Sequence, residues 1–330
     1  MNRIRAAVFG SPYSIDRFPK TTAKTVMKGS LNTFEFRPSF KGLALLVLGL
    51  GILNLIDPLY SQPRNRLDMP EASALSDEDA KALLESFRSY SYPDDYCFRF
   101  RVRHYPYRKK TIEAYGTLWG LFDPVTRTHY QRVHLEKRDP ESPRNFLPIA
   151  RFLFIRGPYP EVWTIDESGE PVSLDPEHWS KPLIEEMSVT VSDMLMPFLY
   201  WENSHYEGPS QVKARPAQSF LLSPPADSGG VCVMPSVRVA FDDEFKGLLQ
   251  SEWLADDGSI LRSIELVSLK KVQEQYIPRT MDYRDMSKRD KTRIDIQAAA
   301  MRVQFDSSVF VPTNLNEPPP IVPSSDFTLF

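Results

Sequence analysis

The longest apolar segment of the chain, residues 42–56 (GLALLVLGLGILNLI), contains no charged residue. As a helix it would be about 22 Å long, which is shorter than the roughly 30 Å hydrocarbon core of a bilayer. Lys41 precedes the segment and Asp57 ends it, an arrangement typical of export signals. We therefore expect residues 42–57 to be a signal peptide or an uncleaved membrane anchor. A buried helix of a globular core is the alternative, which the glycines and the lack of a polar face disfavour.

A helical pattern follows a polar linker over residues 58–75. Ser76 and Asp79 have the spacing of an N-cap with an acidic residue three positions later. The apolar residues that come next recur at helical spacing: Ala80, Leu83, Leu84 and Phe87. This pattern predicts a helix of about 12 residues, apolar on one face, that opens the folded domain.

Beyond this helix the period of the hydrophobic pattern changes to two. Residues 98–104 (FRFRVRH) alternate apolar and cationic side chains, which predicts a half-buried antiparallel strand. Asp257-Gly258 between two later segments predicts a hairpin, because Gly supplies a positive φ. The further predicted strands are 111–121, 126–136, 149–156, 162–166, 211–222, 237–242, 247–255, 259–270, 276–284 and 292–300. The consecutive order of these strands predicts a mainly β (α+β) fold with one curled antiparallel sheet of about 10–11 strands.

One segment, residues 188–201 (SVTVSDMLMPFLYW), breaks the alternation. Its apolar residues cover all sides of a helix: Met194, Leu195, Met196, Phe198, Leu199, Tyr200 and Trp201. Pro197 should break this helix after about two turns or start a second one. The segment either packs into the concave face of the sheet or lines a pocket for an apolar ligand, and its spacing leaves both interpretations open.

Charge divides the chain unevenly, although the formal net charge of its 330 residues is only −3. The basic segment 1–41 carries +6 and the remainder −9. A negative body repels a phosphate backbone, so we expect no nucleic-acid partner. Arg99, Arg101 and Arg103 either form the solvent face of one strand or contact lipid headgroups or an acidic partner. The Pro-rich residues 312–330 predict an extended tail outside the core.

No enzyme constellation is evident in the sequence, which lacks the GxSxG, P-loop and GxGxxG motifs. His129 and His134 are five positions apart in a predicted strand, so they should face opposite sides and cannot share a metal ion. The other histidines are scattered: His104, His178 and His205. Cys97 and Cys232 could pair in an oxidising periplasm. The favoured interpretation is that each is a small, buried apolar residue. We expect no catalytic activity, cofactor or metal.

Several stretches together resemble a known family. Residues 189–202 (VTVSDMLMPFLYWE) and 212–217 (VKARPA) look like the central motif of the outer-membrane lipoprotein-sorting proteins, the LolA-like superfamily. The similarity continues C-terminally in residues 237–242, 249–252, 277–281 and 291–293. It covers about residues 76–311 and departs from the family at Ala214, where Gly is frequent. The N-terminal segment and the tail have no counterpart in the family.

The resemblance implies an incomplete antiparallel β-barrel over residues 76–311, with short helices capping a concave apolar face that holds acyl chains. It implies that residues 194–196 and 198–201 line this cavity. The implied function is an envelope protein that binds lipids or lipoproteins, with a role in lipoprotein sorting to the outer membrane and with envelope partner proteins. Its location would be the periplasm or envelope of a Gram-negative-type bacterium, with residues 42–56 contacting the membrane. The alternative is a membrane-anchored sensor or protein-interaction module with the same fold and no cargo.

Overall fold

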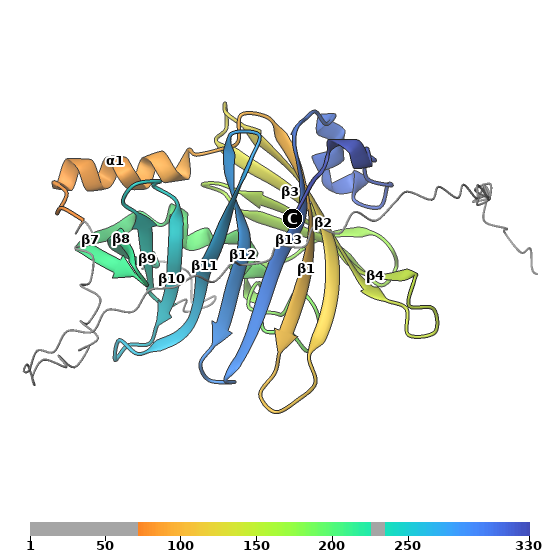
Figure 1. Cartoon of the computed structure of the whole chain (residues 1–330), viewed down its shortest axis with the longest axis horizontal. Coiled ribbons are helices and arrows are strands. Elements are labelled where there is room, and N and C mark those ends of the chain that lie inside the picture. Colours follow the sequence, from red (N-terminus) through yellow and green to blue (C-terminus); the bar gives the residue numbers. More distant parts are fainter. Residues whose placement is uncertain (1–71, 226–234) are drawn as a thin grey trace, which may run out of the picture. The chain divides into compact units, whose positions relative to one another are not determined.

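The structure is a computed structural model that describes residues 72–225 and 235–330 (Figure 1). The expectations for segments 1–41, 42–57 and most of the linker 58–75 lie outside the described residues, and so does the pairing of Cys232. Within the described residues, no helix combines the length and the apolar character that crossing a bilayer requires.

A single antiparallel sheet dominates the described part of the chain (Figure 1). The sheet order is β6-β5-β4-β3-β2-β1-β13-β12-β11-β10-β9-β8-β7, with β14 paired to β13. Strands that are neighbours along this path are consecutive in the chain except at the β1–β13 pair, and β6 and β7 form the two edges. The strands are β1 (Asp95–Tyr105), β2 (Ile112–Asp123), β3 (Thr128–Arg138), β4 (Phe146–Arg156), β5 (Glu161–Ile165), β6 (Pro171–Ser173), β7 (Asn203–Val212), β8 (Arg215–Ser223), β9 (Val237–Asp242), β10 (Leu248–Leu254), β11 (Ile260–Val272), β12 (Gln275–Asp285), β13 (Asp290–Val303) and β14 (Thr328–Leu329).

The sheet curls without closing into a barrel, so the predicted mainly β, incomplete-barrel fold is confirmed. The fourteen described strands exceed the predicted 10–11. The helices are short: α1 (Asp77–Arg88), α2 (Val191–Leu195), and the 3-10 turns η1 (Pro176–His178), η2 (Pro197–Tyr200), η3 (Ser307–Phe310), η4 (Pro312–Asn314) and η5 (Ser324–Asp326). Apolar residues of α1, α2 and η2 pack into one core with the concave side of the sheet, as the capping helices should.

Helix α1 begins as the sequence predicts. The Ser76 hydroxyl accepts a hydrogen bond from the backbone N–H of Asp79 at 3.1 Å, which satisfies one of the N–H groups that the first helical turn leaves without a partner. At the other end, the Arg88 guanidinium donates to the carbonyls of Leu199 (2.5 Å) and Trp201 (2.8 Å). These two bonds attach the end of α1 to the segment that follows α2.

Strand β1 shows how alternation builds the two faces. Phe98, Phe100 and Val102 lie in the main core on the concave side. The arginines between them are bound within the domain: Arg101 and Arg103 approach the Asp295 carboxylate at 3.7 and 2.6 Å, and Arg99 lies 4.1 Å from the centre of the Phe327 ring. Arg99 is exposed and Arg101 and Arg103 are half-buried, so the prediction that these arginines form the solvent face of one strand holds in part. Contact with headgroups or an acidic partner stays a prediction.

Two glycines of β2 shape the concave face. A Cβ atom at Gly116 would lie 2.3 Å from the Phe100 ring, and one at Gly120 would lie 2.1 Å from the Tyr96 ring. Both glycines pair in register with the residue whose ring covers them. The rings of β1 can therefore lie across β2, which only a residue without a side chain allows.

The C-terminal residues 312–330 differ from the prediction of a tail outside the core. Leu315, Val322 and Phe327 are buried in a second apolar cluster with Cys97 and Trp119. The cluster lies on the opposite side of the sheet from the main core, since Cys97 alternates along β1 with the concave residues. The extended-tail prediction is wrong in this respect: the prolines connect short apolar anchors that cover the convex face.

Arg132 holds this segment in place. Its side chain is only 1% exposed, and its guanidinium donates to the backbone carbonyls of Val309 (3.3 Å), Leu315 (3.0 Å) and Glu317. Burial is the main cause that lowers the pKa of Arg132, to about 10. The group therefore remains a cation at neutral pH and pairs with carbonyl dipoles in place of water.

Candidate functional site

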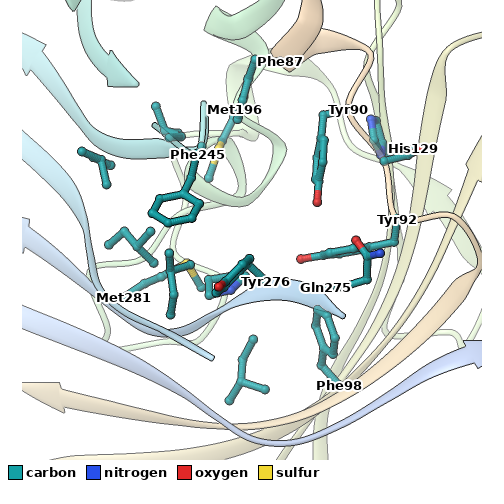
Figure 2. A pocket seen from close by; sticks show the side chains of 18 of the residues that line it. Phe87, Tyr90, Tyr92, Phe98, His129, Met196, Phe245, Gln275, Tyr276 and Met281 are labelled. Atoms are coloured by element: carbon teal, nitrogen blue, oxygen red, sulfur yellow. The ribbon is translucent and has the colours of Figure 1, made fainter. Parts of the chain in front are cut away.

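A cavity of about 520 Å³ opens on the concave side of the sheet (Figure 2). Its walls come from β1–β4 and β8–β13, from the C-terminal end of α1 with the loop that follows, from α2 with its C-cap, and from the β9–β10 and β11–β12 turns. The volume lies within the roughly 300–1,000 Å³ that is typical of ligand pockets. The cavity is therefore the candidate functional site.

The lining of the cavity is mostly aromatic and aliphatic. Figure 2 shows Phe87, Met196 and Phe245 on one side and Tyr90, Tyr92 and His129 facing them, with Tyr276, Met281 and Phe98 around the base. The strand residues reach the cavity because every second side chain of a strand points to the same face. This arrangement suits an apolar ligand, with few polar groups to orient it.

Two of the seven predicted lining residues, Met194 and Met196, line the cavity. Leu195, Phe198 and Leu199 are buried in the main core. Tyr200 and Trp201 are half-buried and pack against that core away from the cavity lining. Contact of any of these seven residues with a lipid stays a prediction.

The break at Pro197 explains this distribution. α2 ends at Leu195, its C-cap Met196 has a left-handed backbone (φ 49°), and Pro197 begins η2. The chain therefore changes direction between two short helical turns, so consecutive residues do not follow one helical face. The predicted interruption of the helix at Pro197 is confirmed.

A buried ion pair fixes α2 against β11. The Asp193 carboxylate is fully buried and accepts hydrogen bonds from the Arg262 guanidinium and, at 2.8 Å, from the backbone N–H of Thr190. Arg262 also donates to the Ser188 carbonyl at 3.0 Å. Burial raises the pKa of Asp193, and the charge of Arg262 opposes that rise. The pair sets the position of Met194 and Met196 at the cavity wall.

Most charged groups of the lining are already partnered. Arg215 binds Asp242 at 2.6 Å, and Lys246 lies 3.8 Å from Asp243. His129 is buried, and burial first and the charge of Arg156 second lower its pKa to about 3. The imidazole is therefore neutral at physiological pH and adds polarity without charge.

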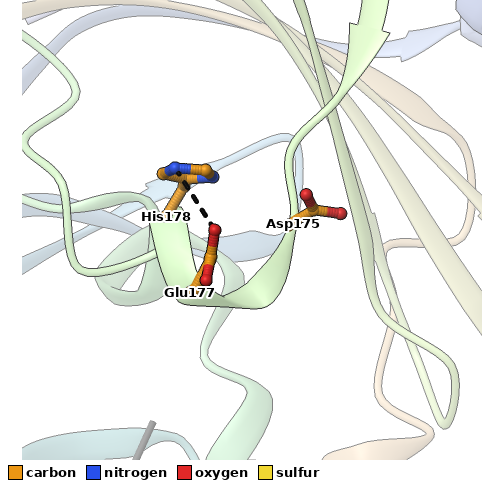
Figure 3. A group of neighbouring side chains, drawn as sticks. All are labelled: Asp175, Glu177 and His178. Atoms are coloured by element: carbon orange, nitrogen blue, oxygen red, sulfur yellow. Dashed lines mark ion pairs between the residues drawn. The ribbon is translucent and has the colours of Figure 1, made fainter. Parts of the chain in front are cut away.

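The histidines lie largely as predicted. His129 lines the cavity, whereas the His134 ring lies 5.1 Å from that of Trp119 on the convex side, so the prediction that they face opposite sides is confirmed. His178 is not isolated: its Nε2 lies 3.7 Å from a Glu177 oxygen, and Asp175, the residue that precedes η1, lies near both (Figure 3). Both acids of this group are exposed, as surface carboxylates commonly are, and the group lies outside the cavity lining.

Sequence reasoning missed most of the lining. Tyr90 and Tyr92 lie in the loop after α1, Phe245 lies in the β9–β10 turn, and Tyr276 lies at the start of β12. The one available signal was the set of three tyrosines in residues 90–96 (YSYPDDY). These residues lie where the hydrophobic pattern changes from helix to strand, so the pattern predicts only a turn there.

The fold is shared with known structures, although no protein-family model and no curated protein matches the sequence. A DUF1329 family protein from Desulfovibrio piger superposes with a TM-score of 0.60 and 9% identity, over 72% of this chain and 98% of that one. A domain named as an outer membrane lipoprotein-sorting protein, from Vibrio parahaemolyticus, gives 0.60 and 10% identity over 73% and 97%. A LolA superfamily protein from Nitrosomonas europaea gives 0.51 and 14% identity over 70% and 97%.

These comparisons define the class of fold. The described domain has the LolA-like architecture, so the resemblance seen in the sequence is confirmed at the level of fold. Sequence identities of 9–14% establish the fold alone, and they carry no cargo or partner over to this chain.

Proposed function

We propose that this protein is an envelope lipid-binding protein that holds an acyl chain of a lipid or lipoprotein in the concave cavity. The observation that carries the proposal is the cavity of about 520 Å³ with its aromatic and aliphatic lining. Each buried CH₂ contributes about 0.8 kcal/mol, so a chain leaves a membrane only for a site of comparable apolarity. A cavity of this kind provides such a site and keeps the cargo releasable.

The fold supports this class of function over an enzyme. The similar Vibrio parahaemolyticus domain is named for lipoprotein sorting, which favours a carrier that binds cargo without reacting with it. We further propose that residues 42–57 export or anchor the domain, which places the cavity in the periplasm or envelope. Envelope proteins that donate or receive the cargo would then be its partners.

The test uses a variant that fills the cavity. Met281 lines the cavity on β12, and Met281→Trp adds volume there (Figure 2). The matched control is Ile321→Trp, because Ile321 is 92% exposed. We expect the delipidated full chain and the control to bind palmitate, and Met281→Trp to bind it at least tenfold more weakly at an unchanged unfolding temperature.

Solvent extraction and mass spectrometry of the purified full chain provide a second measurement. Co-purifying lipid that is depleted in Met281→Trp would support the proposal. Failure of the wild-type chain to bind palmitate or to retain lipid would contradict it and favour the anchored interaction module.

A further inference from the structure

Arg156 is a cation of the cavity lining that, unlike Arg215 and Lys246, has no carboxylate partner among the described residues. It is the last residue of β4 and lies on the concave side, since Phe152 and Phe154, four and two positions earlier, belong to the main core. In the β3–β4 register it pairs with His129. Both residues line the cavity.

No counter-charge for Arg156 is found within residues 72–225 and 235–330. Arg215 and Lys246, the other lining cations, each have a carboxylate within 4.0 Å, whereas Arg156 forms no ion pair with the described residues. Its Nε is buried and has no hydrogen-bond partner among them. The side chain as a whole is half-buried. A guanidinium nitrogen that has lost water without gaining a hydrogen-bond partner is unfavourable, and a bound anion would relieve this cost.

Three phenols near Arg156 are neutral at physiological pH. Burial raises the pKa of Tyr92, Tyr96 and Tyr200, and the charge of Arg156 opposes each rise. These phenols therefore keep their protons and remain potential donors. One cation with neutral donors beside an apolar cavity matches an amphiphile that has an acidic head and an apolar chain.

From this arrangement we infer that the cavity binds a single-chain anionic amphiphile, whose carboxylate or phosphate head is bound by Arg156 and whose acyl chain lies along the aromatic lining. This inference rests on the proposed lipid-binding function and adds the charge and the chain number of the ligand. The volume of about 520 Å³ suits one drug-sized ligand, which corresponds to one acyl chain in place of two. Bidentate guanidinium contacts fix the head, so the ligand enters the cavity in one orientation.

The experiment compares probes that share a chain and differ in the head. Displacement of the neutral dye N-phenylnaphthylamine from the full chain measures the affinity of palmitate, its uncharged methyl ester and palmitoyl lysophosphatidate. We expect at least one of the acids to bind the wild-type chain about 10- to 100-fold more tightly than the ester. Arg156→Gln should abolish this difference and leave the affinity of the ester unchanged. The acid that shows the preference identifies the headgroup as carboxylate or phosphate.

Two controls separate this inference from a structural role and from the proposed function. Arg151→Gln changes an arginine on the opposite face of β4 and should keep the preference for the acid. Without ligand, Arg156→Gln should unfold at the same or a higher temperature, because it removes a half-buried cation that has no ion-pair partner among the described residues. Equal binding of acid and ester to the wild-type chain would overturn the inference while lipid binding stands. Equal affinity for two-chain phosphatidate would overturn the single-chain limit, and failure of every probe would refute the proposed function itself.

Discussion

Replacing Arg132 with Met should release the C-terminal segment from the convex face. The substitution keeps much of the side-chain volume and removes the donors to three carbonyls, those of Val309, Leu315 and Glu317. A hydrogen bond from a charged donor contributes about 1.5–3 kcal/mol, and relief of guanidinium burial offsets part of the loss. We therefore expect a destabilisation of about 3–5 kcal/mol.

Cys97 provides a local reporter for this effect. It lies 1% exposed in the apolar cluster that the C-terminal segment covers. Burial raises the pKa of its thiol to about 12, which suppresses the reactive thiolate. If the lost free energy appears as local opening, the rate of thiol labelling by an aromatic disulfide reagent should rise about 150- to 5,000-fold. The measurement uses a Cys232→Ser background, so that Cys97 is the remaining thiol.

The control for this experiment is Arg138→Met, which changes an exposed arginine at the end of the same strand. It should label at the parent rate. The reasoning is refuted if Arg132→Met labels no faster than the parent and keeps the same free energy of unfolding. Such a result would mean that the apolar anchors alone hold residues 312–330 in place.

Two further predictions concern pH and packing. Burial, with nearby arginines as the second cause, lowers the pKa of His129 and His134 to about 3, so the unfolded chain binds more protons than the folded one below pH ~6.5. The free energy of unfolding should therefore fall by up to about 1.4 kcal/mol per pH unit for each histidine as the pH drops below 6.5. The urea midpoint should decrease between pH 7 and pH 5.5, and this decrease should be smaller in His129→Gln than in the wild-type chain. Gly120→Ala forces a methyl group against Tyr96 and should cost about 1–3 kcal/mol, whereas Gly247→Ala, with open space around it, should be near neutral in thermal unfolding.

Local rules predicted most of the fold. The alternation of residues 98–104 falls inside β1, and Gly258, with φ 79°, forms the predicted hairpin between β10 and β11. The predicted strand 211–222 corresponds to β8, but its predicted start is wrong, because the range crosses a turn at residues 213–214 that separates β7 from β8. β7 was missed because it is an edge strand with Gly-Pro inside it and few buried residues, so its sequence lacks the alternation of a covered strand.

The cavity was largely beyond prediction from sequence. Each strand contributes only one to a few side chains to the lining, and the sheet register that gathers them is a long-range property. Arg156 stands at the end of an apolar strand, where a charge usually marks an exposed terminus. The apolar residues of segment 188–201 were evident, but which of them face the cavity depends on the left-handed turn at Met196.

The seam between β1 and β13 has a consequence for how the protein matures. Each half of the sheet, β1–β6 and β7–β13, is a meander that local hairpins can assemble, whereas the β1–β13 pair joins the earliest strand to one of the last. Contacts of such long sequence separation form slowly, because chain closure must precede them. Both halves supply walls of the cavity, so neither half alone can retain a ligand. We expect a chain emerging from synthesis or translocation to become competent for cargo only when residues 290–303 dock, which protects it from loading before folding is complete.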